Sequence, residues 1–236
     1  MRGLAEKLMM DDKKEYHTFT EILHKHKIPY CMDSGVLLGL MREGKLLNQE
    51  KDIDLQMWSD NKEKIIEIVP ELNALGWKVT IWRYKGLIYQ FRIQRPSKIP
   101  IHIMLFRKYG EWAWCPAGRA TGNPFSSVIG KKLYSAFIKI RRIIRNKLVI
   151  TDVSQWPWKI RRDLGTWWVP AEFFEYTTYH ERYKVYIPEK WDKYLEYRYG
   201  NWRVPVEDWD FWKQDGALKN KLPDEVVDIS MYRESI

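Results

Sequence analysis

Hydrophobic and polar residues alternate along a short segment near position 55 of the chain. The apolar positions are Ile53, Leu55 and Met57, and the polar positions are Asp52, Asp54 and Gln56. A period of two predicts a β-strand with one apolar face and one polar face. The two aspartates then share the polar face, about 6.5 to 7 Å apart at the backbone.

The same kind of pattern predicts the elements on either side of this strand. In chain order, we expect helices over about 3–27, a strand over 30–32, a helix over 36–43, the acidic strand, a helix over 61–75, a hairpin of 78–82 and 87–93, and a strand over 99–106. Pro29 ends the first helical stretch and Gly44 ends the second. Asp60 is the expected N-cap of the third, and Gly76 its end.

This order of elements indicates an α/β (α+β) fold with a mixed sheet. Strand, turn, helix, acidic strand, helix, hairpin and strand is the arrangement expected for a nucleotidyltransferase (polymerase-β-like) core. We assign that core to residues 1–110 and expect a helical, aromatic-rich elaboration over 111–236 that shapes an acceptor site. The pattern is equally compatible with one continuous domain.

Small residues form the turn before the second helix, where a phosphate could bind. Ser34 and Gly35 stand at the expected helix start, where free backbone N–H groups and the positive end of the helix dipole favour a phosphate. The carboxylates of Asp52 and Asp54 can hold a hard cation such as Mg²⁺. Acid pairs and glycine-started helices are common individually, but their order and spacing here favour phosphoryl or nucleotidyl transfer.

Two separate segments resemble the LicD/fukutin-related transferases. Residues 30–44 contain Y-C-M-D-S-G-V-L-L-G-L-M-R-E-G and precede the D-I-D of 52–54, similar to the family pattern D-x-G-T-L-L-G-x-x-R-x-G before D-D-D-I-D. Residues 187–205 are similar to the family segment P-x-x-(Y/W)-x-x-Y-L-x-x-x-Y-G-x-x-W-x-x-P. The resemblance covers roughly residues 15–212, with only loose agreement in the middle.

The resemblance implies a reaction and a cofactor. The family transfers a phospho-alcohol of the phosphocholine or phosphoribitol type from a CDP-activated donor to a hydroxyl of a glycan or lipid-linked glycan. Asp52 and Asp54 would be the catalytic residues and would hold Mg²⁺ or Mn²⁺. The identity of the alcohol and of the acceptor sugar stays open.

Four further positions are implied to bind the donor. Ser34 and Gly35 would orient its phosphates, and Arg42 would reach them bidentately unless it is only a surface charge. Asp33 matches the family's acid before the glycine, where it either supports the turn or acts on the acceptor. No residue stands out as a general base.

One departure from the family pattern concerns the third acid. The family has a further carboxylate on a later strand, and Met104 occupies its expected place in H-I-M-L-F. A thioether is a poor ligand for Mg²⁺. His102 shares the face of Met104 and is the candidate replacement ligand, although a lone histidine is more often structural. The site is therefore either a variant active site or one that retains binding without catalysis.

Composition adds expectations about the cellular location. The 236 residues are 45% hydrophobic, enough for a sizeable core. The chain contains no apolar run of 18 residues, so we expect no membrane-spanning helix. Residues 1–10 are too short and too charged for a secretory signal. Cys31 and Cys115 lack the spacing of a metal site. These features favour a reduced, cytoplasmic protein.

The net charge of +9 indicates an anionic partner. Residues 131–150 contain seven Lys or Arg and no acid, at spacings that predict an amphipathic basic helix. This helix either joins the core or lies on anionic lipid at the inner membrane face, where each basic residue adds ~1 kcal/mol. It would serve RNA equally well, but the resemblance disfavours a nucleic-acid partner.

Tryptophan is concentrated towards the C-terminus, with eight of the thirteen between residues 156 and 212. Such residues build a core, a sugar-stacking surface or an interfacial belt. We expect most of them in the core, with Trp167, Trp168 or Trp202 as candidates to line an acceptor groove.

Three functional hypotheses follow from the sequence. The first is the CDP-alcohol phosphotransferase, the second a nucleotidyltransferase that adds NMP to RNA, protein or a small molecule. The third is a non-catalytic nucleotide- or glycan-binding relative, suggested by Met104. The first releases CMP and the second pyrophosphate, whereas the third has no turnover for an Asp54→Asn change to remove.

Overall fold

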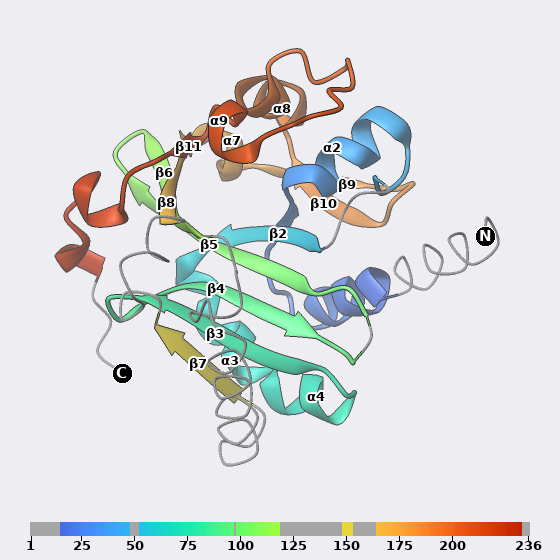
Figure 1. Ribbon diagram of the computed structural model, residues 1–236. Helices are drawn as coiled ribbons and strands as arrows, with labels where there is room; N and C mark the ends of the chain where they lie inside the picture. The colour runs from blue at the N-terminus through green and yellow to red at the C-terminus, as the bar shows by residue number, and fades with distance from the viewer. Residues whose placement is uncertain (1–14, 48–51, 97, 119–147, 153–163, 233–236) are drawn as a thin grey trace, which may run out of the picture.

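The computed structural model describes residues 15–47, 52–96, 98–118, 148–152 and 164–232 (Figure 1). Residues 15–25 are helical, and the expected helix over residues 3–14 lies outside the described part. The elements that follow are β1 (Cys31–Met32), α2 (Ser34–Glu43), β2 (Ile53–Trp58), η1 (Ser59–Asn61), α3 (Lys62–Glu67), α4 (Val69–Ala74), β3 (Lys78–Tyr84), β4 (Leu87–Gln94) and β5 (Ile101–Tyr109).

The second half of the chain contributes more strands than helices. Its elements are β6 (Trp112–Gly118), β7 (Leu148–Asp152), β8 (Leu164–Pro170), α7 (Glu172–Glu175), β9 (Thr177–His180), β10 (Val185–Pro188), α8 (Trp191–Tyr199), α9 (Phe211–Gln214), β11 (Leu218–Lys219), η3 (Pro223–Glu225) and η4 (Ile229–Tyr232). Figure 1 shows α2 and α8 near one end of β2, and α3 and α4 next to β3 and β4.

The strands form a mixed sheet, which confirms the expected α/β class. Its main path runs β11-β8-β6-β5-β4-β3-β7, and β2 joins at β5 and in turn carries β1. β2 is parallel to β5 and β7 is parallel to β3, whereas the other pairs are antiparallel. β9 and β10 form a separate antiparallel hairpin.

One long strand joins the two ends of the sheet. The first part of β5, Ile101–Phe106, pairs with β2, whereas Arg107–Tyr109 pairs with β6. The strands after residue 110 therefore extend the sheet that holds the acidic strand. Residues on β5 connect the two regions directly.

The helical character expected for residues 111–236 is wrong for much of the described chain. β8 reads Leu-Gly-Thr-Trp-Trp-Val-Pro, and its aromatic and β-branched residues fit a buried, pleated surface better than a helix. The basic helix expected over residues 131–150 also needs correction at its end. Residues 148–150 belong to β7, which pairs with Val79–Ile81, while residues 131–147 lie outside the described part.

The helix expected over 61–75 is interrupted in the middle. α3 ends at Glu67, with Ile68 as its C-cap, and α4 begins at Val69 with a proline in its first turn. Pro70 cannot donate the hydrogen bond that a continuous helix requires there, and its ring would clash with the preceding turn. Asp60 is not the N-cap, because it lies in η1 and Asn61 takes that position without a side-chain hydrogen bond.

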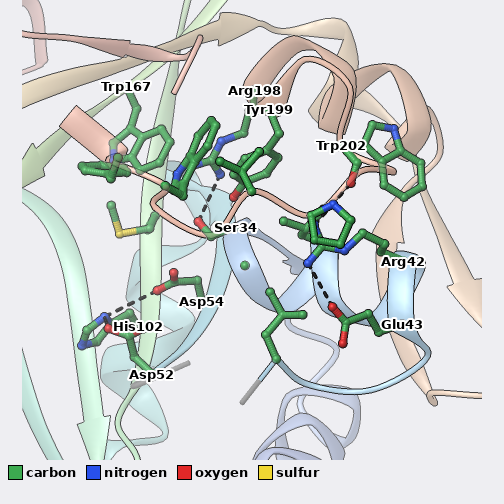
Figure 2. Close-up of a pocket in the computed structure, with 18 of the residues that line it drawn as sticks. Ser34, Arg42, Glu43, Asp52, Asp54, His102, Trp167, Arg198, Tyr199 and Trp202 are labelled. Carbon is green, nitrogen blue, oxygen red and sulfur yellow. Dashed lines mark hydrogen bonds and ion pairs between the residues drawn. The ribbon is translucent and has the colours of Figure 1, made fainter. Parts of the chain in front are cut away.

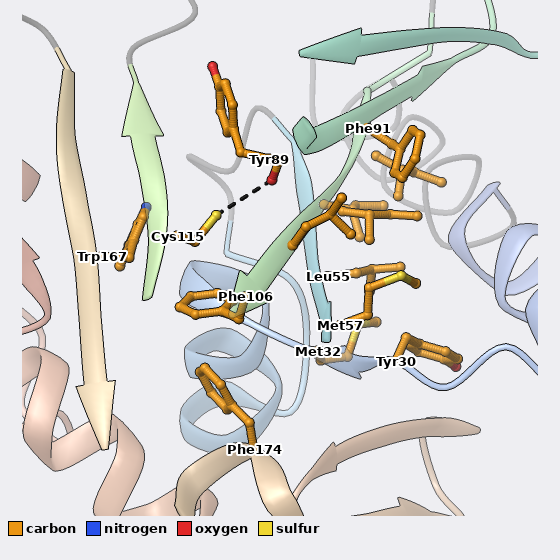
Figure 3. Close-up of a cluster of buried hydrophobic side chains, with 14 of the residues drawn as sticks. Tyr30, Met32, Leu55, Met57, Tyr89, Phe91, Phe106, Cys115, Trp167 and Phe174 are labelled. Atoms are coloured by element: carbon orange, nitrogen blue, oxygen red, sulfur yellow. Dashed lines mark hydrogen bonds between the residues drawn. The ribbon is translucent and has the colours of Figure 1, made fainter. Parts of the chain in front are cut away.

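The core lies between the sheet and the helices around it. Figure 3 shows the side chains of Met32, Leu55 and Met57 gathered in one apolar cluster. On the other side of β5, Phe106 packs against Phe174 with ring centroids 4.7 Å apart. Cys31 and Cys115 are both free and buried, and burial raises the pKa of the Cys115 thiol to about 12.

The helix α2 is defined at both ends and packs tightly in the middle. Asp33 is its N-cap, and Gly44 ends it in the left-handed conformation, with φ of 70°. Gly39 lies inside the helix, where a Cβ atom would stand 2.7 Å from the carbonyl oxygen of Lys45 and 2.9 Å from Cγ of Leu47. The returning chain therefore needs a glycine at this position.

We expect Gly39→Ala to destabilise the protein by about 1–3 kcal/mol, because the added methyl group forces the chain at Lys45 and Leu47 away from α2. Helix propensity alone predicts the opposite, a gain of about 1 kcal/mol. Urea unfolding of the two proteins distinguishes these effects. An increase in the free energy of unfolding would contradict the close packing at Gly39.

No helix in the described part of the chain is both long enough and apolar enough to cross a membrane.

Candidate functional site

A cavity of about 890 Å³ lies between the start of α2, the polar face of the sheet and the segment that follows α8. Ser34 and Gly35 line it from α2, and Asp52 and Asp54 line it from the acidic strand. Figure 2 shows the acidic residues on one side of this space and aromatic residues on the other. The cavity thus brings together the turn and the acid pair that the sequence analysis selected.

Asp52, Asp54 and His102 form a compact cluster of potential metal ligands. One ligand atom from each lies within 4.8 Å of the others. His102 Nδ1 is 3.4 Å from Asp52 Oδ2 and 3.5 Å from Asp54 Oδ1. Two carboxylates and an imidazole suit a divalent cation, and the imidazole favours Mn²⁺ more than Mg²⁺.

Strand register explains why His102, and not Met104, completes this cluster. β2 and β5 are parallel, and Asp54 is aligned with His102 whereas Gln56 is aligned with Met104. Met104 therefore lines the cavity one row beyond the acids. The His102 side chain is 11% exposed, and its Nε2 atom is buried without a hydrogen-bond partner in the described residues. The donor set present fits a cation.

The turn before α2 is held against the acidic strand. The backbone N–H of Asp33 donates to the carbonyl oxygen of Asp54 at 3.0 Å, so the helix start and the acid pair have a fixed relative position. Ser34 has φ of 53°, a left-handed conformation that is uncommon for residues other than glycine. Ser34 and Gly35 occupy the first positions of the helix and face the cavity.

Asp33 supports this turn from inside the protein and does not line the cavity. Its side chain is 2% exposed, and Oδ1 accepts hydrogen bonds from the Ser34 N–H at 2.6 Å, the Tyr194 hydroxyl at 2.5 Å and Arg198 Nη1 at 2.9 Å. Burial raises the pKa of this carboxyl, while Arg198 and Tyr194 oppose the rise. Of the two roles considered for Asp33, the geometry fits support of the turn.

Arg198 is a prominent part of the site that the sequence analysis did not single out. It lies in the last turn of α8, its side chain is 1% exposed, and it contacts both Asp33 and Asp215. Arg198 lies within residues 187–205, the second segment that resembles the family. In the sequence, however, a single arginine in a helix cannot be distinguished from an ordinary surface charge. Only the fold shows that it is buried beside the turn.

Arg42 lines the cavity but is already engaged. Its Nη2 atom donates to Glu43 at 3.0 Å, and its Nη1 atom donates to the Trp202 carbonyl at 3.4 Å (Figure 2). The expected bidentate contact with phosphates would require these bonds to rearrange. In the present geometry, Arg42 connects α2 to the segment after α8.

Aromatic residues form the wall opposite the acids. Trp167 and Trp202 line the cavity, whereas Trp168 stacks on Trp112 outside it, with ring centroids 5.7 Å apart. Trp209 and Phe211 also line the cavity and were not selected from the sequence, because Trp209 lies in a loop and Phe211 begins a helix of only four residues, too short for a periodic pattern. These aromatic side chains make this wall of the cavity largely apolar.

Comparison with known proteins gives only limited similarities. No family model matches the chain. A stretch of 98 residues is 28% identical to an uncharacterized protein of Rickettsia prowazekii (strain Madrid E), covering 39% of this chain and 37% of that protein. The lincomycin-bound structure of the lincosamide antibiotic adenylyltransferase LnuA has a TM-score of 0.33 and 17% sequence identity, over 43% of this chain and 60% of that chain.

The chain thus spans less than two thirds of each protein. Neither similarity is extensive enough to assign it to a family.

Proposed function

We propose that this protein is a metal-dependent transferase of the LicD type, built on a nucleotidyltransferase-like core. It moves a phospho-alcohol from a CDP-activated donor to a glycan hydroxyl. The main support is spatial: two segments that resemble the same family, about 150 residues apart in the chain, line one cavity. The first supplies Ser34 and Asp54, and the second supplies Tyr199 and Trp202.

The acidic end of the cavity carries out the chemistry in this proposal. Asp52, Asp54 and His102 would hold a divalent cation, which would supply positive charge against the diphosphate of the donor. At the start of α2, a helix of ten residues, Gly35 binds a phosphoryl oxygen through its backbone N–H, whereas Ser34 uses its hydroxyl because its own N–H donates to Asp33 Oδ1. The link from Asp33 N–H to the Asp54 carbonyl keeps these two groups in register.

The opposite end binds the uncharged parts of the substrates. The partly buried ring of Tyr199 is suited to stacking on a nucleobase or a sugar, whereas one face of Trp167 is already covered by Arg198. A contact of residues 131–150 with anionic membrane lipid, which would bring a lipid-linked acceptor close, stays a prediction, because 131–147 lie outside the described residues.

The experiment that tests the proposal combines binding with product analysis. Titration calorimetry with CDP-choline and CDP-ribitol, with and without Mn²⁺, should show metal-dependent binding that the Asp52→Asn/Asp54→Asn double variant lacks. With a glycan acceptor, the nucleotide product should be CMP. Failure to bind either CDP compound in the presence of Mn²⁺ would overturn the proposal.

Release of pyrophosphate from a nucleoside triphosphate would instead support nucleotidyl transfer by the same cavity. Binding without any turnover of a donor, across a panel of glycan acceptors, would favour the non-catalytic relative.

A further inference from the structure

The turn at Ser34 adopts a conformation that its own residue type does not favour. Ser34 has φ of 53°, yet it stands at the first position of α2, where the candidate phosphate site begins. A residue in a sparsely populated conformation persists only when its surroundings hold it there. Its surroundings therefore show what sets the shape of the phosphate site.

Arg198 holds this turn through two hydrogen bonds from one nitrogen. Its Nη1 atom donates to Ser34 Oγ at 3.1 Å and to Asp33 Oδ1 at 2.9 Å (Figure 2 shows Arg198 above Ser34). Arg198 and Asp33 are 165 residues apart in the chain. The contact therefore joins the end of α8 to the beginning of α2.

The guanidinium group is fixed on its remaining sides as well. Its Nε and Nη2 atoms donate to Asp215 Oδ2 at 3.1 and 2.5 Å, and its Cζ atom lies 3.9 Å from the centre of the Trp167 ring. Asp215 in turn accepts the backbone N–H of Ala217 at 2.9 Å. Arg198 consequently has little freedom to turn towards a ligand.

Close backbone packing places Asp215 against α8. The N–H of Gly216 donates to the Arg198 carbonyl at 2.9 Å, and a Cβ atom at residue 216 would stand 2.2 Å from the Tyr197 carbonyl oxygen. Only glycine permits this approach. The segment that carries Asp215 is therefore fitted to the helix that carries Arg198.

The charges around Arg198 argue against a direct role in binding phosphate. Two buried carboxylates, Asp33 and Asp215, contact this one guanidinium group. Its positive charge is fully matched inside the protein, which leaves no excess for an anionic ligand. Its contact with Ser34 has a different consequence, because a hydroxyl has one donor and two acceptor positions.

We infer that Arg198 is a positioning residue that holds the Ser34 turn and directs the Ser34 hydroxyl proton into the cavity, towards a phosphoryl oxygen of the ligand. Since Arg198 N–H uses an acceptor position of Ser34 Oγ, the hydroxyl proton is available to the ligand. This inference rests on the proposed function, which supplies the phosphoryl group.

A double-mutant cycle with Mn²⁺ and CDP-choline tests the inference. The proteins are the wild type, Ser34→Ala, Arg198→Lys and the double variant; lysine keeps the charge but lacks the planar fork. Each single change should weaken binding about tenfold, and the double change should weaken it no more than the stronger single. If the loss of affinity in the double variant equals the product of the two single losses, Arg198 acts independently of Ser34 and the inference is overturned.

Cytidine serves as the phosphate-free ligand in the same series. Its affinity should be equal in all four proteins, because Ser34 meets only the phosphate. Parallel losses for cytidine and CDP-choline would assign Arg198 a general structural role and would contradict positioning of the phosphate site.

A second measurement does not depend on any nucleotide. Amide hydrogen exchange of residues 34–37 in the ligand-free protein should accelerate about tenfold or more in Arg198→Lys and in Asp215→Asn, with exchange in β3 and β4 unchanged. Arg203→Lys is the matched control, because Arg203 pairs with Asp192 at the surface.

Unchanged exchange at residues 34–37 would overturn the inference even if CDP-choline binds. If the wild type fails to bind CDP-choline while exchange accelerates as expected, the proposed function fails and the positioning of the turn is retained.

Discussion

Replacing Asp54 by Asn is expected to abolish divalent cation binding and to lower turnover by about a thousandfold or more. Asn keeps the shape of the side chain but removes the charge that attracts the cation. Asp54 is aligned with His102 across β2 and β5, and His102 Nδ1 lies 3.5 Å from Asp54 Oδ1. Mn²⁺ titration followed by electron paramagnetic resonance measures the first effect, and CMP release from CDP-choline measures the second.

Asp60→Asn provides the matched control for this change. Asp60 is exposed in η1, directly after the strand that carries Asp54, and belongs to no cluster of potential metal ligands in the described chain. The Asp60→Asn change should leave Mn²⁺ affinity and turnover unchanged. If Asp54→Asn kept its full affinity for Mn²⁺, the cation would have to bind somewhere other than the cluster of Asp52, Asp54 and His102.

Arg198→Met should destabilise the folded protein by about 3–5 kcal/mol, because it leaves Asp33 and Asp215 buried without their common cationic partner. Met preserves much of the apolar volume over the Trp167 ring, so lost packing contributes little to the difference. The free energy of unfolding is obtained from urea titration, with the midpoint and the slope compared between the two proteins.

Arg203→Met is the control for this second prediction. Arg203 also pairs with an aspartate, Asp192, and also lies over an aromatic ring, that of Trp202 at 4.4 Å. Its side chain is 61% exposed, so its loss should cost no more than about 1 kcal/mol. Equally small losses in both variants would show that the buried carboxylates near Arg198 are not left uncompensated.

Local sequence patterns were sufficient for the elements that carry the acid pair and the turn. The alternation at 53–57 corresponds to β2, and Gly44 ends α2 as expected. The hairpin of β3 and β4 turns at residues 85 and 86, where both residues have positive φ. Each of these features depends on neighbours in the chain, so the sequence contains the relevant information directly.

Features that depend on distant residues were not predictable in the same way. His102 could only be considered as a replacement ligand, because the register between β2 and β5 decides whether it or Met104 stands beside Asp54. Arg198 lies 165 residues from Asp33, and no periodic pattern connects them. The strands after residue 110 were missed because β8 pairs with β6 and β11, which are distant in the chain, and no local pattern reveals those pairings.

The continuity of β5 limits how the cavity can respond to a ligand. His102 is near the start of this strand, and Arg107–Tyr109 at its end pair with β6, which leads to β8 and Trp167. A hinge between the acidic side and the aromatic side would have to break that shared ladder. We therefore expect Asp54 on β2 and Trp167 on β8 to keep a constant separation when a ligand binds.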